Sequence, residues 1–266
     1  MKQIEMGEYK QLLLEILIKI DRVCHENNIP YVIFYGTLLG AVRHQGFIPW
    51  DDDIDIAVPR EHFSRLQKAI NAVSKNEKIN FIYLSTNPDT IYSGGKVCDT
   101  TTILHESTYK TVEGYGAFID VFPFDNFSDN NILRSIDFHY CRMLHKLEMH
   151  SSMVSYELSD SKFRNILRYI AFKATRIVNT QKLLRYMILH YQKFNQKKTQ
   201  YLGLPYERFR FDRNIFEDTV DLEFEGHLFK APRDYHSVLK ERYGDYMTLP
   251  PESARVNKHT LNCIQK

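Results

Sequence analysis

Residues 35–58 read "YGTLLGAVRHQGFIPWDDDIDIAV" and place four carboxylates within five positions, between two apolar runs. The four are Asp51, Asp52, Asp53 and Asp55. Carboxylates this close repel one another, and burying any of them costs free energy unless a cation or a hydrogen-bond network compensates. The stretch therefore indicates either a solvated acidic loop or a site that holds cations.

Alternation within this stretch predicts a strand over residues 54–58, which would begin at Asp53 if the alternation extends that far. Successive side chains of a strand point to opposite faces, so Asp53 and Asp55 would share one face while Ile54 and Ile56 pack on the core. The Cα atoms of the two carboxylates would lie about 6.6 Å apart, close enough for both to approach the same divalent ions. Mg²⁺ is the expected ion, because it takes one or two carboxylates and completes its shell with water and phosphate oxygens.

A third carboxylate, Asp120, lies in a similar setting. It is flanked by apolar residues in "FIDVFPFD", which predicts another strand, and an isolated carboxylate there is costly without partners. A calcium EF-hand loop is excluded, because Ile56 and His62 stand where glycine and glutamate are needed. The solvated loop stays open as the alternative to a metal site.

The chain around this stretch predicts a mixed α/β (α+β) fold. Thr37 is expected to cap a short helix over residues 38–43. Other helices are expected over 8–28, 60–75, within 130–198, and between Pro232 and Gly244. Other strands are expected over 29–36, 79–84 and 116–124.

Composition bounds the class of protein. A chain of 266 residues with 43% hydrophobic content fits one large globular domain or two intimate ones. Glu5 and Glu8 interrupt the apolar core that a signal peptide would need, and the longest uncharged run, 27–42, is short and broken by proline and glycine. The four cysteines are far apart and indicate neither a zinc site nor disulfides, so a reducing cytoplasm is the expected compartment.

Three blocks of the sequence resemble the LicD family, within the nucleotidyltransferase superfamily. They are "YGTLLGAVRHQGFIPWDDDIDIAVPR", "GAFIDVFPFD" and, near the C-terminal end, "RYGDYMTLPP". The resemblance implies a nucleotidyltransferase-like mixed sheet in a catalytic core over residues 1–127. A mainly helical region over 128–266 would bind the acceptor or a surface and close on the core.

The resemblance also implies roles for single residues. Asp53, Asp55 and Asp120 would be the metal ligands and catalytic carboxylates, holding one or two Mg²⁺ ions, with Mn²⁺ as an alternative. The ions would assist an in-line displacement at phosphorus, with Asp120 helping to deprotonate the acceptor and Asp51 as second choice. Gly36 and Thr37 would form a turn on the phosphate side.

Two cations near these blocks are candidates for binding donor phosphates. Arg43 follows the Gly-Thr turn, and Lys96 lies in "SGGKV". Either side chain could neutralise a diphosphate, and each is equally explained as an ordinary surface cation.

The reaction that the resemblance implies is transfer of phosphocholine from CDP-choline to a sugar hydroxyl of a cell-surface glycan, with release of CMP. The glycan would be teichoic acid or a related polysaccharide precursor, carried on a lipid. A polyol-phosphate transferase using CDP-glycerol or CDP-ribitol, and a nucleotidyltransferase releasing pyrophosphate, stay open. Trp50 and Tyr35 could seat the quaternary ammonium. No nucleic-acid partner is expected.

Residues 161–206 contain no Asp or Glu. The segment interleaves apolar residues with ten cations: Lys162, Arg164, Arg168, Lys173, Arg176, Lys182, Arg185, Lys193, Lys197 and Lys198. Basic amphipathic helices of this kind suit an anionic membrane surface or a polyanionic glycan, which would place the protein peripherally at the inner face of the membrane. The alternative is a pair of core-packed helices with a solvated basic face.

Overall fold

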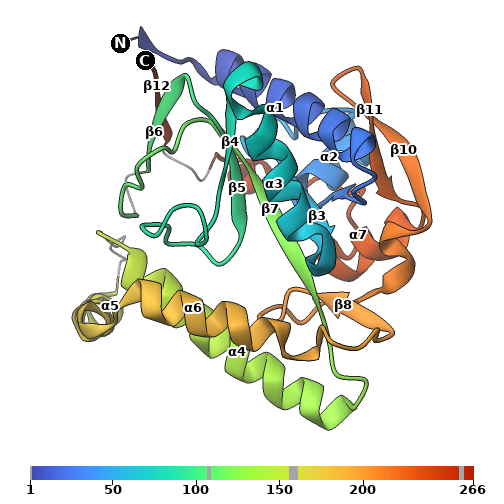
Figure 1. The fold of residues 1–266 in the computed structure, drawn as a ribbon. Coiled ribbons are helices and arrows are strands. Elements are labelled where there is room, and N and C mark those ends of the chain that lie inside the picture. The colour runs from blue at the N-terminus through green and yellow to red at the C-terminus, as the bar shows by residue number, and fades with distance from the viewer. Residues whose placement is uncertain (1, 107–108, 156–160, 258–260) are drawn as a thin grey trace.

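The computed structural model describes residues 2–106, 109–155, 161–257 and 261–266. A mixed β-sheet with helices against it forms the main body, and a layer of helices from the middle of the chain lies along one side (Figure 1). The mixed α/β class predicted from the sequence is confirmed. The two ends of the chain meet where β1 (Lys2–Gln3) pairs with β12 (Leu261–Gln265).

The central sheet brings the predicted strands together. Its order is β2-β3-β7-β5-β4, and β8 and β9 extend it from the C-terminal end of β7. Strands β3 and β7 run parallel, whereas the other paired strands of this sheet are antiparallel. The strands are β2 (Val32–Ile33), β3 (Asp55–Pro59), β4 (Ile79–Ile82), β5 (Gly95–Asp99), β7 (Phe118–Asn126), β8 (Tyr201–Gly203) and β9 (Phe211–Asp212).

Two long helices pack against this sheet (Figure 1). The first, α1 (Met6–Glu26), contacts β5 and β7, and the second, α3 (Arg60–Glu77), contacts β3, β4 and β7. Their buried residues recur at the three- and four-residue spacing of an amphipathic helix, which confirms both predicted helices. A second buried cluster, around Phe124 and Phe211, packs β8 and β9 onto the sheet.

The short helix after β2 differs from the prediction. Helix α2 (Tyr35–His44) has Phe34 as its N-cap, and Thr37 lies inside its first turn. The Thr37 hydroxyl accepts a hydrogen bond from the backbone N–H of Asp55 at 2.8 Å. The prediction that Thr37 caps this helix is therefore wrong, because its hydroxyl ties the helix to the start of β3.

The helical layer confirms the helices predicted within 130–198. It consists of α4 (Asn131–Ser152), α5 (Lys162–Ala174) and α6 (Thr180–Tyr191). Helices α4 and α6 share a buried cluster of their own, whose centre includes Cys141 and Met187. The predicted last helix is α7 (Tyr235–Tyr243), which ends at Gly244 with φ +69°, a conformation that favours glycine.

Several strands of the second half were not predicted. Strands β10 (Thr219–Phe224) and β11 (His227–Pro232) form a hairpin, and β12 pairs with β6 (Thr102–Glu106). Strands from both sides of residue 127 thus share sheets, through β7 with β8 and β6 with β12. The division into 1–127 and 128–266 stays a prediction.

Among the described residues, no helix combines the length and the apolar content that crossing a bilayer requires.

Candidate active site

Two of the predicted carboxylates lie side by side on neighbouring strands. Asp55, the first residue of β3, is in register with Asp120 of β7, and Asp120 is in register with Lys96 of β5. The Lys96 ammonium lies 2.7 Å from Asp120 Oδ1, with its side chain almost fully buried. Three adjacent strands thus present two carboxylates and one cation in a single row.

Asp51 and Asp53 approach the same row from the segment before β3. The strand begins only at Asp55, so Asp53 lies in the preceding loop and the predicted alternation starts too early. A Cβ atom on Gly36 would lie 2.6 Å from Asp51 Oδ2 and 3.8 Å from Asp53 Oδ1. Gly36 is therefore required where the first turn of α2 meets the carboxylates. A helix N-terminus at this point is a favourable place for a phosphate group.

Asp55 shows how strongly these groups interact. Burial raises the pKa of its carboxyl well above the ordinary value of 3.8, and the negative charges of Asp53, Asp120 and Asp51 raise it further, while Lys96 lowers it. One buried ammonium thus faces a group of carboxylates that repel one another. Their oxygens are the ligands that Mg²⁺ and Mn²⁺ prefer, so this acidic cluster, Asp51, Asp53, Asp55 and Asp120, fits divalent cations.

Asp52 is not part of the acidic cluster. Its carboxylate is buried and accepts a hydrogen bond from Asn257 Nδ2 at 2.9 Å. The run of acidic residues therefore divides into three that approach the site and one that anchors a segment near the C-terminal end. Asp52 provides a natural control for variants of the cluster.

A cavity of about 750 Å³ opens beside the acidic cluster. Its lining includes Gly36 and Asp51, and also Arg43 and Trp50. Most of the remaining lining comes from a segment near the C-terminal end: Tyr243, Asp245, Tyr246, Thr248, Leu249, Pro250, Pro251, Ala254 and Val256. The third sequence block that suggested the family therefore folds back onto the first.

Arg43 lies in this cavity, apart from Lys96. Its guanidinium donates a hydrogen bond to the Tyr246 carbonyl at 2.8 Å and lies 6.0 Å from the Trp50 ring. Burial lowers the pKa of Arg43. Of the two predicted phosphate-binding cations, Arg43 is thus held by a carbonyl and an aromatic ring, whereas Lys96 already neutralises Asp120.

Two residues near the site were missed from the sequence. Tyr243 lines the same cavity as Asp51. Burial raises the pKa of Tyr243 to about 12, the neighbouring Arg242 lowers it, and the charges of Asp55 and Asp51 raise it. The Arg255 guanidinium lies 5.6 Å from the Trp50 ring. Tyr243 lies within the block "RYGDYMTLPP", so that block was the available signal, while Arg255 lies beyond it.

The rings predicted to seat a quaternary ammonium both have cationic neighbours. Arg43 and Arg255 lie near Trp50, and the Arg242 guanidinium lies 4.7 Å from the Tyr35 ring. Tyr35 also has φ +44°, an uncommon backbone conformation for an aromatic residue, directly before Gly36. The role of these rings in binding choline stays a prediction.

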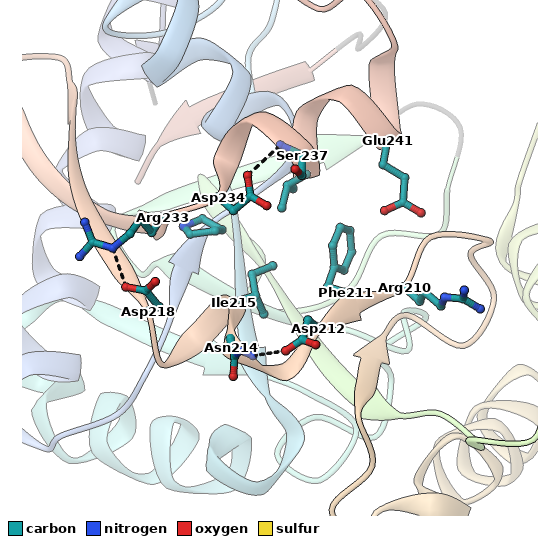
Figure 2. A pocket seen from close by; sticks show the side chains of 12 residues that line it. Arg210, Phe211, Asp212, Asn214, Ile215, Asp218, Arg233, Asp234, Ser237 and Glu241 are labelled. Atoms are coloured by element: carbon teal, nitrogen blue, oxygen red, sulfur yellow. Dashed lines mark hydrogen bonds and ion pairs between the residues drawn. The ribbon is translucent and has the colours of Figure 1, made fainter.

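A separate cavity of about 400 Å³ lies between residues 210–218 and α7 (Figure 2). Several of its polar side chains already form ion pairs or hydrogen bonds with neighbouring residues. Arg233 pairs with Asp218 at 2.6 Å, and the carboxylates of Asp212 and Asp234 accept hydrogen bonds from nearby backbone N–H groups. These contacts cap turns and the start of α7, so this cavity offers no comparable group of reactive side chains.

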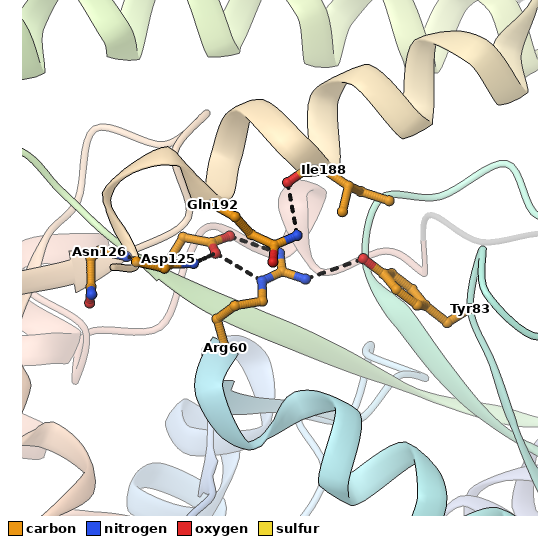
Figure 3. A network of polar contacts seen from close by, with 7 residues as sticks. Arg60, Tyr83, Asp125, Asn126, Ile188 and Gln192 are labelled. Carbon is orange, nitrogen blue, oxygen red and sulfur yellow. Dashed lines mark hydrogen bonds and ion pairs between the residues drawn. The ribbon is translucent and has the colours of Figure 1, made fainter. Parts of the chain in front are cut away.

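A buried polar network joins the helical layer to the sheet (Figure 3). Arg60 donates to both oxygens of Asp125, at 2.8 and 2.7 Å, and to the Tyr83 hydroxyl at 3.2 Å. Asn195, which follows α6, donates to Asp125 Oδ1 at 2.6 Å. Because the partners satisfy one another, we interpret this network as structural.

One further group of possible metal ligands lies between α4 and α6. It comprises Asp137, Cys141 and His190, whose ligand atoms lie within 4.8 Å of one another. The Lys193 ammonium already pairs with Asp137, and His190 Nε2 lies 2.8 Å from the same carboxylate. The Lys193 ammonium thus already supplies a positive charge to this group.

The fold and the acidic cluster define a class of protein in which carboxylates from the inner strands of a mixed sheet meet the first turn of a short helix. A family model described as "LicD/FKTN/FKRP, nucleotidyltransferase domain" matches residues 28–166, just over half of the chain. The chain therefore belongs to the LicD/FKTN/FKRP family. The matched range contains all four residues of the acidic cluster as well as Gly36, Arg43 and Lys96.

Known relatives include one that aligns over nearly the full chain. The chain is 26% identical to "Lipopolysaccharide cholinephosphotransferase LicD" of Haemophilus influenzae, over 97% of both chains. It is also 36% identical to an uncharacterized protein of Rickettsia typhi, over 49% of this chain and 40% of the relative. A further uncharacterized protein, of Rickettsia prowazekii, is 44% identical over 24% of each chain.

The raised pKa of Asp55 predicts how stability depends on pH without metal. The folded protein holds this proton more tightly than the unfolded chain does. The contribution of Asp55 to the free energy of unfolding is therefore complete below about pH 4. It is lost as the pH rises through the pKa that Asp55 has in the folded protein. In EDTA, we expect the free energy of unfolding of the wild type to fall over this range, and that of Asp55→Asn to fall less. Urea denaturation at a series of pH values measures both.

Added Mg²⁺ or Mn²⁺ should raise the stability of the wild type near neutral pH, since a ligand that binds only the folded state stabilises it. The same ions should raise the stability of the Asp55→Asn protein much less. Identical pH profiles for the two proteins would show that Asp55 is not destabilised by its neighbours.

Proposed function

We propose that this protein transfers phosphocholine from CDP-choline to a sugar hydroxyl of a cell-surface glycan and releases CMP. The observation that carries the proposal is the convergence of the acidic cluster with Gly36. It occurs in a chain that aligns over 97% of its length with a protein named as a lipopolysaccharide cholinephosphotransferase. The acceptor polymer is the lipopolysaccharide, teichoic acid or related glycan of the cell that makes the protein.

In the proposed reaction, the acceptor oxygen attacks the phosphorus that carries choline. The new bond joins this oxygen to phosphorus, and the bond from phosphorus to the bridging oxygen breaks, leaving with CMP. Divalent ions held by the acidic cluster would neutralise the negative charge of the phosphates and the charge that develops on the leaving group. Their binding would require ionised carboxylates and would therefore displace the proton that burial favours on Asp55.

The chain's own side chains have distinct roles in this proposal. Asp120 accepts the acceptor proton, because its side chain is 28% exposed whereas Asp55 is buried. Lys96 fixes Asp120 through their 2.7 Å ion pair, and so positions the base more than it binds the donor. The first turn of α2 and Arg43 would bind the donor phosphates, since Gly36, Arg43 and Asp51 line one cavity.

The donor is best tested with a panel of CDP-linked compounds. We expect the purified protein with Mg²⁺ and a glycan acceptor to consume CDP-choline and form CMP and a phosphocholine ester, as resolved by phosphorus NMR. CDP-glycerol and CDP-ribitol should be poor donors. Use of these polyol donors in place of CDP-choline would make the protein a polyol-phosphate transferase, and release of pyrophosphate from a nucleoside triphosphate would make it a nucleotidyltransferase.

A further inference from the structure

Helix α5 exposes an apolar stripe that the rest of the described chain does not cover. Phe163, Ile166 and Ile170 are 69%, 57% and 56% exposed, and Ile177, just after the helix, is 91% exposed. The first three recur at the spacing that places side chains on one face of a helix. Soluble proteins rarely expose large apolar side chains together, and such patches usually mark an interaction site.

The packing of α5 explains this exposure. The helix contacts α4 and the short helical turn Thr175–Ile177, and it lies at the edge of the helical layer (Figure 1). None of its exposed apolar residues belongs to a buried cluster of the described chain. By contrast, α6 buries Leu184, Met187 and Tyr191. The acid-free segment 161–206 therefore divides into a core-packed helix, α6, and a helix whose apolar stripe stays exposed, α5.

The charges around the stripe identify the kind of surface that it fits. Lys162 and Lys173 are exposed and lie on the same side of the helix as Ile166, by the periodicity of 3.6 residues. Arg164 and Arg168 lie on the opposite side, and the helix contains no acidic residue. An apolar stripe flanked by lysines is the arrangement of helices that lie in the interface of an anionic bilayer.

Two other cations of segment 161–206 make contacts within the folded chain. Arg176 donates hydrogen bonds to the carbonyls of His150 and Met153, at the end of α4, and packs on Phe172 at 4.1 Å. Lys193 pairs with Asp137. Reversing these charges would disturb packing, so they are unsuitable for testing a surface.

From these observations we infer that α5 docks on an anionic lipid surface, with Phe163, Ile166 and Ile170 in the headgroup region and Lys162 and Lys173 beside lipid phosphates. This inference stands on α5 alone and does not depend on which donor the acidic cluster cleaves. It places the protein where a lipid-carried substrate would be presented.

Vesicle co-sedimentation tests the inference on the full chain. Wild-type protein should bind vesicles of phosphatidylcholine mixed with phosphatidylglycerol, bind pure phosphatidylcholine vesicles much less, and be released by salt. Lys162→Glu/Lys173→Glu should weaken binding at least about tenfold, because each basic residue near such a surface contributes about fivefold. Ile166→Asp/Ile170→Asp should weaken it to a similar extent. A matched control is Lys68→Glu/Lys75→Glu on α3, whose side chains are also exposed and which should bind as the wild type does.

Three outcomes would overturn the inference. Wild-type protein could fail to bind the anionic vesicles. The Ile166→Asp/Ile170→Asp protein could bind them normally, which would show that the apolar stripe does not enter the headgroup region. Wild-type protein could be a dimer that the same substitutions dissociate, which would assign the stripe to a second copy of the chain. Donor cleavage without vesicles should be unchanged in all these variants, so the inference and the proposed reaction can fail separately.

Discussion

Asp55→Asn is expected to reduce transfer at least about 100-fold while leaving the fold intact, since even partners of metal ligands typically contribute 10–100-fold. Asn keeps the size of the side chain but removes the charge that would bind a cation. The Thr37 hydroxyl bonds to the backbone N–H of Asp55, which the substitution does not change. Initial rates with CDP-choline, together with circular dichroism, measure activity and fold in the same samples.

Asp53→Asn and Asp120→Asn should show losses of the same order, because their carboxylates face the same group. Asp52→Asn is the matched control, since its side chain is bound by Asn257 outside the acidic cluster, and it should retain most of the activity. Full activity of any of the three cluster variants, or of the wild type in EDTA, would contradict the assigned role.

Asp125→Ala is expected to lower the free energy of unfolding by about 3–5 kcal/mol, because it leaves the Arg60 guanidinium buried without its carboxylate. The two side chains are 8% and 0% exposed, and two hydrogen bonds join them (Figure 3). The substitution also removes the acceptor of Asn195. Urea denaturation at neutral pH gives the free energy.

Asp218→Ala provides the comparison for this loss. Asp218 pairs with Arg233 at a similar distance, 2.6 Å, but both side chains are 61% exposed. Exposed pairs contribute at most about 1 kcal/mol, so this variant should be nearly as stable as the wild type. Equal losses for Asp125→Ala and Asp218→Ala would mean that the Arg60 network does not hold the helical layer to the sheet.

The local patterns of the sequence were sufficient for most helices and for the strands that carry carboxylates. Alternation around Asp55 and the apolar setting of Asp120 each predicted a strand, and β3 and β7 contain them. What these patterns could not give is the pairing of the two strands. Parallel register joins residues 65 positions apart, and helices α1 and α3 both pack against this part of the sheet. That register, together with the cation from β5, forms the row of charges.

Other features depend on contacts between distant residues. Strands β12 and β6 pair although more than half of the chain separates them. The residues of neither strand form a pattern that distinguishes it from a loop. Thr37 resembles a helix cap in sequence, yet its hydroxyl binds the start of β3. Lys96 resembles a phosphate-binding cation, and only the register of β5 with β7 shows that it lies on Asp120. In each case a long-range partner competes with the local pattern and determines the structure.

The central claim is that the acidic cluster binds divalent cations for the chemistry at phosphorus. Mn²⁺ binding, followed by electron paramagnetic resonance of the free ion during a titration, tests it most directly. Wild-type protein should bind Mn²⁺, more tightly with CDP-choline present, whereas Asp55→Asn and Asp120→Asn should lose most of this binding and Asp52→Asn should keep it. Equal Mn²⁺ binding by the wild type and the Asp55→Asn protein would contradict the claim.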